Sequence, residues 1–229
     1  MEIYANNLVI KNNMNRLIHI ISLIALFAAA QAIHAKDAAP QRILCYGDSI
    51  TDTGTWVKTV GEDDAFVTIN AGRSGRRASQ ATKELKPYLE QHSELDAIII
   101  FLGVNDLPAR DKRPGDVKVA GCVADISEAI DLALTRFAPE YIILAAPCNV
   151  NPDTMSGRNR QKGYHIAPPL LAELEKEYQT LAKKKGIRFL SLLDVVSKEN
   201  FKDGLHPNAA GDAEIAEAVL SFLTKKFGS

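Results

Sequence analysis

A serine and a distant aspartate–histidine pair could together carry out acyl transfer. Asp203 and His206 are three residues apart, so a single turn of chain would place both on one side, with their Cβ atoms about 5 to 6 Å apart. The carboxylate can then hold the imidazole in one tautomer, while the imidazole accepts a hydroxyl proton. Ser49, in the string Gly-Asp-Ser-Ile, is the candidate source of that hydroxyl.

Groups that could stabilise an oxyanion follow two further apolar runs. Gly72 comes after the run over 66–71, and Asn105 comes after the run over 97–102. A glycine after a strand lets its N–H meet a ligand with no side chain in the way, and asparagine supplies a neutral amide donor. With the Ser49 N–H, these groups could surround the negative charge on a carbonyl oxygen. Each of them alone also suits an ordinary turn, so only the combination is informative.

The elements that must position these groups are short apolar runs, each followed by a longer segment of helical character. Five strands are predicted, over 42–46, 66–71, 97–102, 141–145 and 188–193. Continuous apolar runs such as 97–102 are typical of strands covered on both faces, as in a parallel sheet. The alternation of strands and helices predicts a three-layer α/β domain. Ligands of such sheets bind outside the carboxyl ends of the strands.

Apolar residues at steps of three and four predict amphipathic helices over 119–137, 170–181 and 215–223. The first should stop before Pro139, and the second should close with lysines at 183–185 and a cap at Gly186. The polar stretch over 147–169 is longer than a plain joint and is expected to form a rim or lid. Within it, Tyr164 and His165 are expected to be structural rather than in contact with a substrate.

Residues 1–35 are expected to be a signal peptide, and residues 36–229 the folded domain. Lys11 and Arg16 precede an apolar run over 17–30, and small residues at 30, 32 and 35 suit cleavage. That run is shorter than the roughly 20 residues that span a bilayer. The expected location is therefore secreted or periplasmic, with no stable membrane insertion after cleavage. An uncleaved anchor is the alternative, and Met14 is an alternative start.

The charge balance and the cysteines exclude several classes of protein. Because 27 Lys and Arg stand against 28 Asp and Glu, no long-range field favours a polyanion, which argues against nucleic-acid binding. Cys45, Cys122 and Cys148 could form at most one bridge, and buried free thiols are the favoured interpretation. No Cys or His spacing is typical of a metal site, and neither a dinucleotide-binding glycine motif nor a phosphate-loop lysine is present.

The four motifs together resemble the SGNH (GDSL) hydrolase family, whose blocks match residues 47–50, 70–72, 103–106 and 203–207. The resemblance implies a flavodoxin-like three-layer α/β/α sandwich with a five-stranded parallel sheet. It also implies that Ser49 is the nucleophile, His206 the base and Asp203 its orienting acid. The Ser49 and Gly72 N–H groups and the Asn105 side chain would form the oxyanion hole, and no metal or organic cofactor is required. The α/β-hydrolase motif G-x-S-x-G is absent, since residue 51 is Thr.

The predicted function is that of a secreted serine esterase that cleaves small acyl groups, with acetyl favoured, from a carbohydrate or another small molecule. Arg73, Arg76 and Arg77 form a basic cluster that could hold an anionic group, and Asp48, Arg73 and Arg76 are predicted to contact the substrate. Two alternatives stay open. One is a lysophospholipase, thioesterase or arylesterase of the same fold, and the other is an inactive flavodoxin-like binding module. The sequence makes no prediction of oligomeric state.

Overall fold

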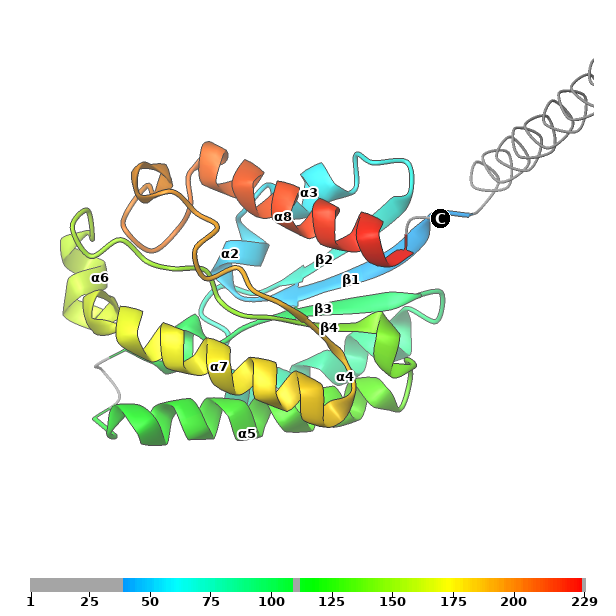
Figure 1. Ribbon diagram of the computed structural model, residues 1–229, viewed down its shortest axis with the longest axis horizontal. Coiled ribbons are helices and arrows are strands. Elements are labelled where there is room, and N and C mark those ends of the chain that lie inside the picture. The colour runs from blue at the N-terminus through cyan, green and yellow to red at the C-terminus, as the bar shows by residue number, and fades with distance from the viewer. Residues whose placement is uncertain (1–38, 109–111, 228–229) are drawn as a thin grey trace, which may run out of the picture. The chain divides into compact units, whose positions relative to one another are not determined.

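Five parallel strands in the order β2-β1-β3-β4-β5 form the sheet at the centre of the fold (Figure 1). The strands are β1 Gln41–Gly47, β2 Phe66–Gly72, β3 Ala97–Phe101, β4 Ile142–Ala145 and β5 Arg188–Leu190. This computed structural model describes residues 39–108 and 112–227. The predicted signal peptide, residues 1–35, lies outside the described residues. The chain divides into two units, and residues 40–227 hold all the elements below.

The central strands are buried along most of their length, as their sequences predict. All five residues of β3 are buried, and so are the last five of β1. A strand covered on both faces needs a run of apolar side chains in place of the alternation of a half-exposed strand. The predicted five-stranded parallel sheet is confirmed.

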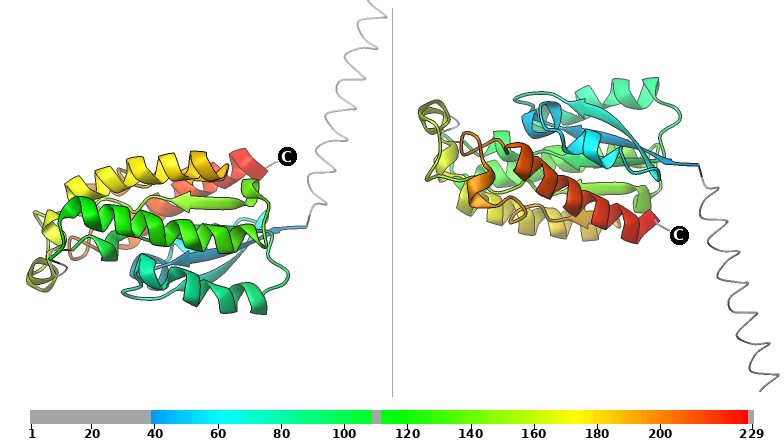
Figure 2. Two further views of the ribbon diagram at one scale, coloured as in Figure 1. Left: turned by 90° about the horizontal axis from the view of Figure 1, so that it is seen from below. Right: turned by 90° about the horizontal axis from the view of Figure 1, so that it is seen from above.

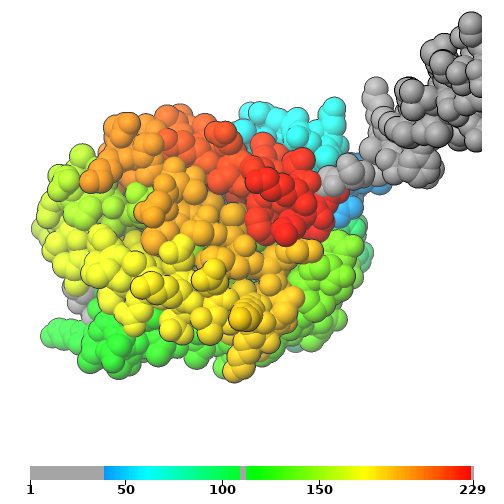
Figure 3. Space-filling model, in the orientation of Figure 1, coloured from blue at the N-terminus to red at the C-terminus, as the bar shows by residue number. Residues whose placement is uncertain are grey.

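Helices cover both faces of the sheet. On one face α3 (Trp56–Val60) packs against α8 (Ala209–Phe227), and on the other α5 (Gly115–Leu134) lies between α4 (Ala81–Gln91) and α7 (Pro168–Lys185). Figure 2 shows these two sets of helices from opposite sides. The arrangement is the predicted three-layer α/β/α sandwich. In Figure 3, α7, α8 and the chain between them form the face toward the viewer.

Two short helices, α2 (Ser49–Asp52) and α6 (Gly157–Lys162), follow β1 and β4. None of the helices in the described part of the chain is long and apolar enough to cross a membrane. Cys45, Cys122 and Cys148 are all buried and unpaired, as the favoured interpretation of the sequence has it.

The ends of some elements differ from the predictions for identifiable reasons. The predicted strand over 188–193 keeps regular pairing only over Arg188–Leu190. Pro147, which follows β4, has no N–H to donate to the ladder. Beyond it, one backbone hydrogen bond, from Asn149 N to Leu193 O at 2.7 Å, joins the chain after β4 to the chain after β5. The helix predicted over 119–137 ends at Leu134, although Phe137 is still buried.

One predicted helix end is confirmed in detail. Gly186 caps α7 with a left-handed backbone, φ +70, and its N–H points back to the carbonyls of Ala182 and Lys183. This is the conformation in which glycine avoids the steric cost of a Cβ. Lys183, Lys184 and Lys185 occupy the last turn of the helix, where cations favour the negative end of its dipole.

Candidate active site

Ser49 lies where β1 ends and α2 begins. Asp48 precedes it as the N-cap of α2, and its side chain accepts a hydrogen bond of 3.0 Å from Ile50 N. This bond fixes the backbone on both sides of Ser49, because a capping carboxylate satisfies an otherwise unpaired N–H of the first turn. The Ser49 side chain remains partly exposed at the carboxyl edge of the sheet.

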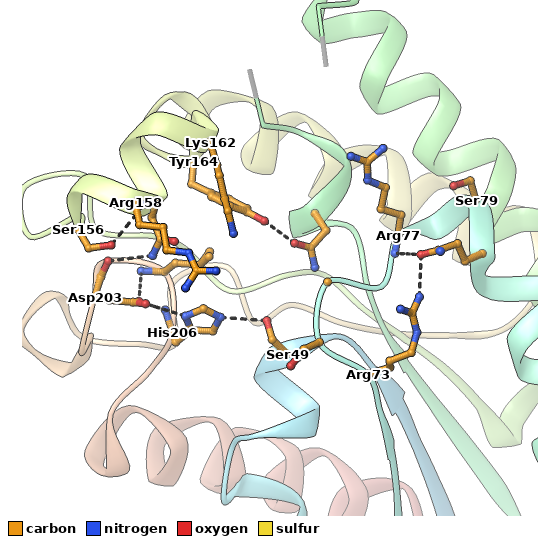
Figure 4. Close-up of a pocket in the computed structure, with 16 residues that line it drawn as sticks. Ser49, Arg73, Arg77, Ser79, Ser156, Arg158, Lys162, Tyr164, Asp203 and His206 are labelled. Carbon is orange, nitrogen blue, oxygen red and sulfur yellow. Dashed lines mark hydrogen bonds and ion pairs between the residues drawn. The ribbon is translucent and has the colours of Figure 1, made fainter. Parts of the chain in front are cut away.

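Ser49, His206 and Asp203 form a continuous chain of hydrogen bonds (Figure 4). Ser49 Oγ lies 3.0 Å from His206 Nε2, and His206 Nδ1 lies 2.9 Å from Asp203 Oδ2. An ionised carboxylate can only accept, so Nδ1 carries the ring proton and Nε2 is left to accept from the serine hydroxyl. The arrangement can therefore move a proton from Ser49 to His206.

The loop that carries Asp203 holds its carboxylate in the charged form. Asp203 Oδ1 accepts from His206 N at 2.8 Å and from Leu205 N at 3.1 Å, while Oδ2 faces the imidazole. Partial burial opposes ionisation, but these hydrogen bonds and the His206 ring outweigh it and lower the pKa of the Asp203 carboxyl to about 2. Asp203 is consequently an anion throughout the neutral pH range.

A pocket of about 610 Å³ opens over this chain of hydrogen bonds (Figure 4). Its described lining is almost entirely polar, and the only aliphatic side chain in it is Leu205. The lining consists of Ser49, Arg73, Ser74, Gly75, Arg77, Ser79, Gln80, Asn105, Ser156, Arg158, Asn159, Lys162, Tyr164, Asp203, Leu205 and His206. Within the described ranges, no group of three or more His, Cys, Asp or Glu side chains is placed to hold a metal ion.

The Asn105 amide reaches the pocket from the turn after β3 and has a fixed orientation. Asn105 is 4% exposed, its Nδ2 donates to Arg76 O at 3.2 Å, and its Oδ1 accepts from the Tyr164 hydroxyl at 2.5 Å. The Arg76 carbonyl can only accept, so it fixes the amide nitrogen as the end that faces it, and the oxygen is left to accept from Tyr164. Tyr164, expected from its sequence position to be structural, supports this amide and also lines the pocket.

Gly72 does not face the pocket, and its predicted place in the oxyanion hole is wrong. Its N–H donates to Asn70 Oδ1 at 2.8 Å. A Cβ at this position would lie 2.2 Å from Asp52 N, so glycine is needed here for close packing of β2 against α2.

Gly75, three residues further on, lines the pocket in its place. Its backbone is left-handed, φ +76, which suits glycine, and its N–H has no hydrogen-bond acceptor among the described residues. The sequence carries no periodic signal that distinguishes Gly75 from Gly72, because both are glycines close to the end of one predicted strand.

Two of the three predicted substrate contacts are also wrong, since Asp48 and Arg76 are buried and line no part of the pocket. Asp48 is enclosed at the cap of α2, where burial raises the pKa of its carboxyl to about 7 against the bond from Ile50 N. Arg76 is 1% exposed. Its Nη1 donates to Gly47 O and Ala71 O, both at 2.6 Å, and its guanidinium stacks on Tyr46 at 4.1 Å from the ring centre.

Arg73 does line the pocket, but its guanidinium is already paired. Its Nε and Nη2 donate to the two carboxylate oxygens of Glu84 at 2.8 and 2.9 Å, which is the bidentate geometry of a strong ion pair. Gln80 accepts a further bond from Nη2 at 2.8 Å. Arg73 therefore supports the wall of the pocket through a carboxylate that it shares with Arg76.

The sequence profile of the GDSL-like lipase/acylhydrolase family matches residues 45–213. The chain belongs to this family. It is a carboxylic ester hydrolase by that membership, and the matched residues span both the Ser49 and the Asp203–His206 segments. No curated protein matches the chain significantly.

Solved structures share this fold at low sequence identity. A carbohydrate acetylesterase from Sinorhizobium meliloti is 19% identical with a TM-score of 0.66, and the match covers 82% of this chain and all of that one. An inhibitor-bound aryl esterase from M. smegmatis is 22% identical with a TM-score of 0.70 and the same coverage. A lipase/acylhydrolase from Enterococcus faecalis is 22% identical with a TM-score of 0.60, covering 81% of this chain and 96% of that one.

The buried position of Arg76 leads to a prediction about stability. We expect Arg76→Gln to lower the free energy of unfolding by about 3 kcal/mol, because two strand-end carbonyls lose their charged donor in a buried setting. Urea unfolding followed by circular dichroism measures the change.

Arg73→Gln is the matched control, since Arg73 shares the Glu84 partner but its side chain is 43% exposed. An ion pair with that exposure contributes about 1 kcal/mol or less. Equal losses of stability in the two variants would contradict the structural part given to Arg76.

Proposed function

We propose that this protein hydrolyses esters of small acyl groups, acetyl above all, on a carbohydrate or another small alcohol. The observation that carries the proposal is the hydrogen-bonded chain from Ser49 through His206 to Asp203 at the floor of a polar pocket. The family membership supports the reaction, and the pocket lining supports the class of substrate.

The reaction begins with the transfer of the Ser49 hydroxyl proton to His206 Nε2. As the proton leaves, Ser49 Oγ attacks the ester carbonyl carbon, and the carbonyl oxygen takes up the negative charge. Asp203 holds the imidazolium in place and stabilises its positive charge. His206 then gives the proton to the departing alkoxide, which leaves as the alcohol, and the acyl group remains on Ser49 Oγ.

In the proposed mechanism three donors stabilise the oxyanion: the Ser49 N–H, the Gly75 N–H and the Asn105 Nδ2 group. All three residues line the pocket. Such donors act strongly because their positions are set before the charge develops. In the second half of the reaction, water gives a proton to His206 and attacks the acyl carbon. The tetrahedral intermediate collapses to the free acid, and Ser49 regains its proton.

The polar lining favours a short acyl chain. Each CH₂ group that moves from water to an apolar wall contributes about 0.8 kcal/mol to binding. Leu205 is the one aliphatic side chain in the described lining, so an added methylene finds little apolar surface to cover. A lysophospholipase would need such a surface.

The sequence over 1–35 supports a further part of the proposal, which is that the enzyme acts outside the cytoplasm. We propose that this segment is a signal peptide and that residues 36–229 form the secreted or periplasmic enzyme. An ester-bearing carbohydrate of the cell surface or its surroundings is then within reach. Sequencing of the mature N-terminus after expression in a bacterial host tests this, with a start near Lys36 expected.

The nucleophile is tested by Ser49→Ala. We expect the variant to lose the catalysis that depends on the nucleophile. In serine hydrolases, substrate binding and the oxyanion donors alone still hydrolyse the ester about 10³ to 10⁴ times faster than water does. The wild type should gain the mass of a fluorophosphonate adduct, and the variant should not. Ser221→Ala, at an exposed serine of α8, is the control and should keep full activity. An unlabelled wild type would favour the inactive binding module.

Acyl specificity is tested with p-nitrophenyl esters of increasing chain length. The value of kcat/KM should not rise from the acetate to the octanoate, because the added methylenes gain no apolar contact. Steady-state assays measure kcat/KM for each ester, at ester concentrations below those at which the long-chain esters aggregate. A maximum at eight carbons or more would favour a lysophospholipase or a thioesterase over the proposed enzyme.

The bond between Tyr164 and Asn105 predicts a loss of kcat in Tyr164→Phe. Without the hydroxyl, the Asn105 amide loses about 1 kcal/mol of orienting energy, so kcat should fall about 5- to 10-fold with little change in KM. Asn105→Ala should cost on the order of 10²- to 10³-fold. If Tyr164 acts by orienting Asn105, adding Tyr164→Phe to Asn105→Ala costs nothing more. Additive losses would show that Tyr164 acts elsewhere.

A further inference from the structure

The pocket is strongly cationic. Four positively charged side chains line it, namely Arg73, Arg77, Arg158 and Lys162. The single acid in the described lining is Asp203, and its carboxylate is taken up by His206. A substrate would be bound most strongly by those of the four cations that have no acidic partner within the protein.

Two of the four have an acidic neighbour within the protein. Arg73 is held bidentately by Glu84. Arg77 makes no ion pair within the described ranges, but its charge lowers the pKa of the Asp106 carboxyl, which burial raises to about 6. Both cations therefore lie near a carboxyl of the pocket wall.

Arg158 and Lys162 have no such partner, because neither makes an ion pair with any residue of the described ranges. They lie four residues apart on α6, so their side chains share one face of the helix, where two like charges repel. The protein places this unfavourable pair at the mouth of a pocket, and an anionic ligand is what would compensate it.

The backbone of α6 is fixed to the loop of the catalytic acid. Ser156 N donates to Asp203 O at 3.0 Å, and Asn159 Nδ2 donates to the same carbonyl at 3.3 Å. Ser156 also caps the helix through its side chain. Arg158 and Lys162 are thus presented from a segment whose position relative to His206 is set by hydrogen bonds.

The side of the pocket identifies the part of the ester that these cations would meet. Figure 4 shows Arg158 and Lys162 on the His206 side of Ser49, whereas Arg77 lies on the opposite side. In serine esterases the base that accepts the serine proton returns it to the leaving alcohol, so the alcohol part of the ester lies beside His206. A negative group on the alcohol would then face Arg158 and Lys162.

We propose that Arg158 and Lys162 form a subsite for an anionic group on the alcohol part of the substrate, such as the carboxylate of an acidic sugar or a sulfate. The inference rests on the proposed esterase function and names its substrate class. It places on α6 the anion-binding function that the sequence predicted for the cluster of Arg73, Arg76 and Arg77. The acyl group remains small, and the charge selects the alcohol.

A pair of matched acetyl esters tests the subsite. The probes are 4-acetoxybenzoate, which carries a carboxylate on the alcohol part, and 4-acetoxybenzamide, its neutral counterpart. The wild type should prefer the benzoate. In Arg158→Gln/Lys162→Gln, kcat/KM for the benzoate should fall about 10- to 100-fold, the value of one or two charge-assisted hydrogen bonds, while that for the benzamide changes less than about 3-fold.

Arg160→Gln is the matched control. It removes one positive charge from the same helix, but Arg160 is exposed and lines no part of the pocket. The preference of this variant for the benzoate should stay within about 2-fold of the wild-type value, whereas Arg158→Gln alone should lower it. Replacing the benzoate with 4-acetoxybenzenesulfonate shows whether the subsite prefers a carboxylate or a sulfonate. Equal activity of the wild type on charged and neutral esters would overturn the proposal, as would equal losses on both in the double variant.

A binding experiment keeps this test separate from the test of the esterase function. Calorimetric titration of 4-acetoxybenzoate into Ser49→Ala protein needs no turnover. Binding that is weakened about 10-fold or more by Arg158→Gln/Lys162→Gln supports the subsite even if the wild type proves inactive. Binding that is unchanged by the two substitutions overturns it, whatever the wild-type activity.

Discussion

A buried guanidinium holds the carboxyl edge of the sheet together. Arg76 donates to the carbonyls of Gly47 and Ala71, which lie at the ends of β1 and β2, and it also pairs with Glu84 of α4. A desolvated arginine is tolerated only where its donors are satisfied, and here the satisfying groups belong to three different elements. The positions of Ser49 after β1 and of the 72–77 turn after β2 both depend on this cation. The wall of the pocket therefore depends on a buried charge that does not itself line the pocket.

Much of this architecture could be predicted because it follows from periodicity and from one topological rule. Buried parallel strands read as apolar runs, and their carboxyl ends meet at one edge, so Ser49 and His206 could be brought together although 157 residues separate them. The local pairing of Asp203 with His206 follows from a spacing of three. These inferences need only the order of elements and the chemistry of the residues that follow them.

The details that failed depend on directions that the sequence does not encode locally. Gly72 ends β2 and Gly75 lies three residues further on, and only the folded backbone shows that the N–H of Gly72 donates to Asn70. Arg73, Arg76 and Arg77 look alike as neighbours in a basic string, yet the three differ in burial and in partners. Arg158 and Lys162 lie in the rim predicted over 147–169, but a polar segment between strand and helix gives no periodic signal of which side chains face a pocket.

The hydrogen bonds that join α6 to the carbonyl of Asp203 have a consequence for how such an enzyme could diversify. Because those bonds use the backbone of residue 156 and the side chain of Asn159, the pocket-facing positions 158 and 162 can change without loss of these hydrogen bonds. New alcohol preferences are then open to single substitutions, whereas deletions or insertions within the helix would displace the histidine loop as well. Variation in selectivity on this scaffold should accordingly accumulate as point changes on one helical face.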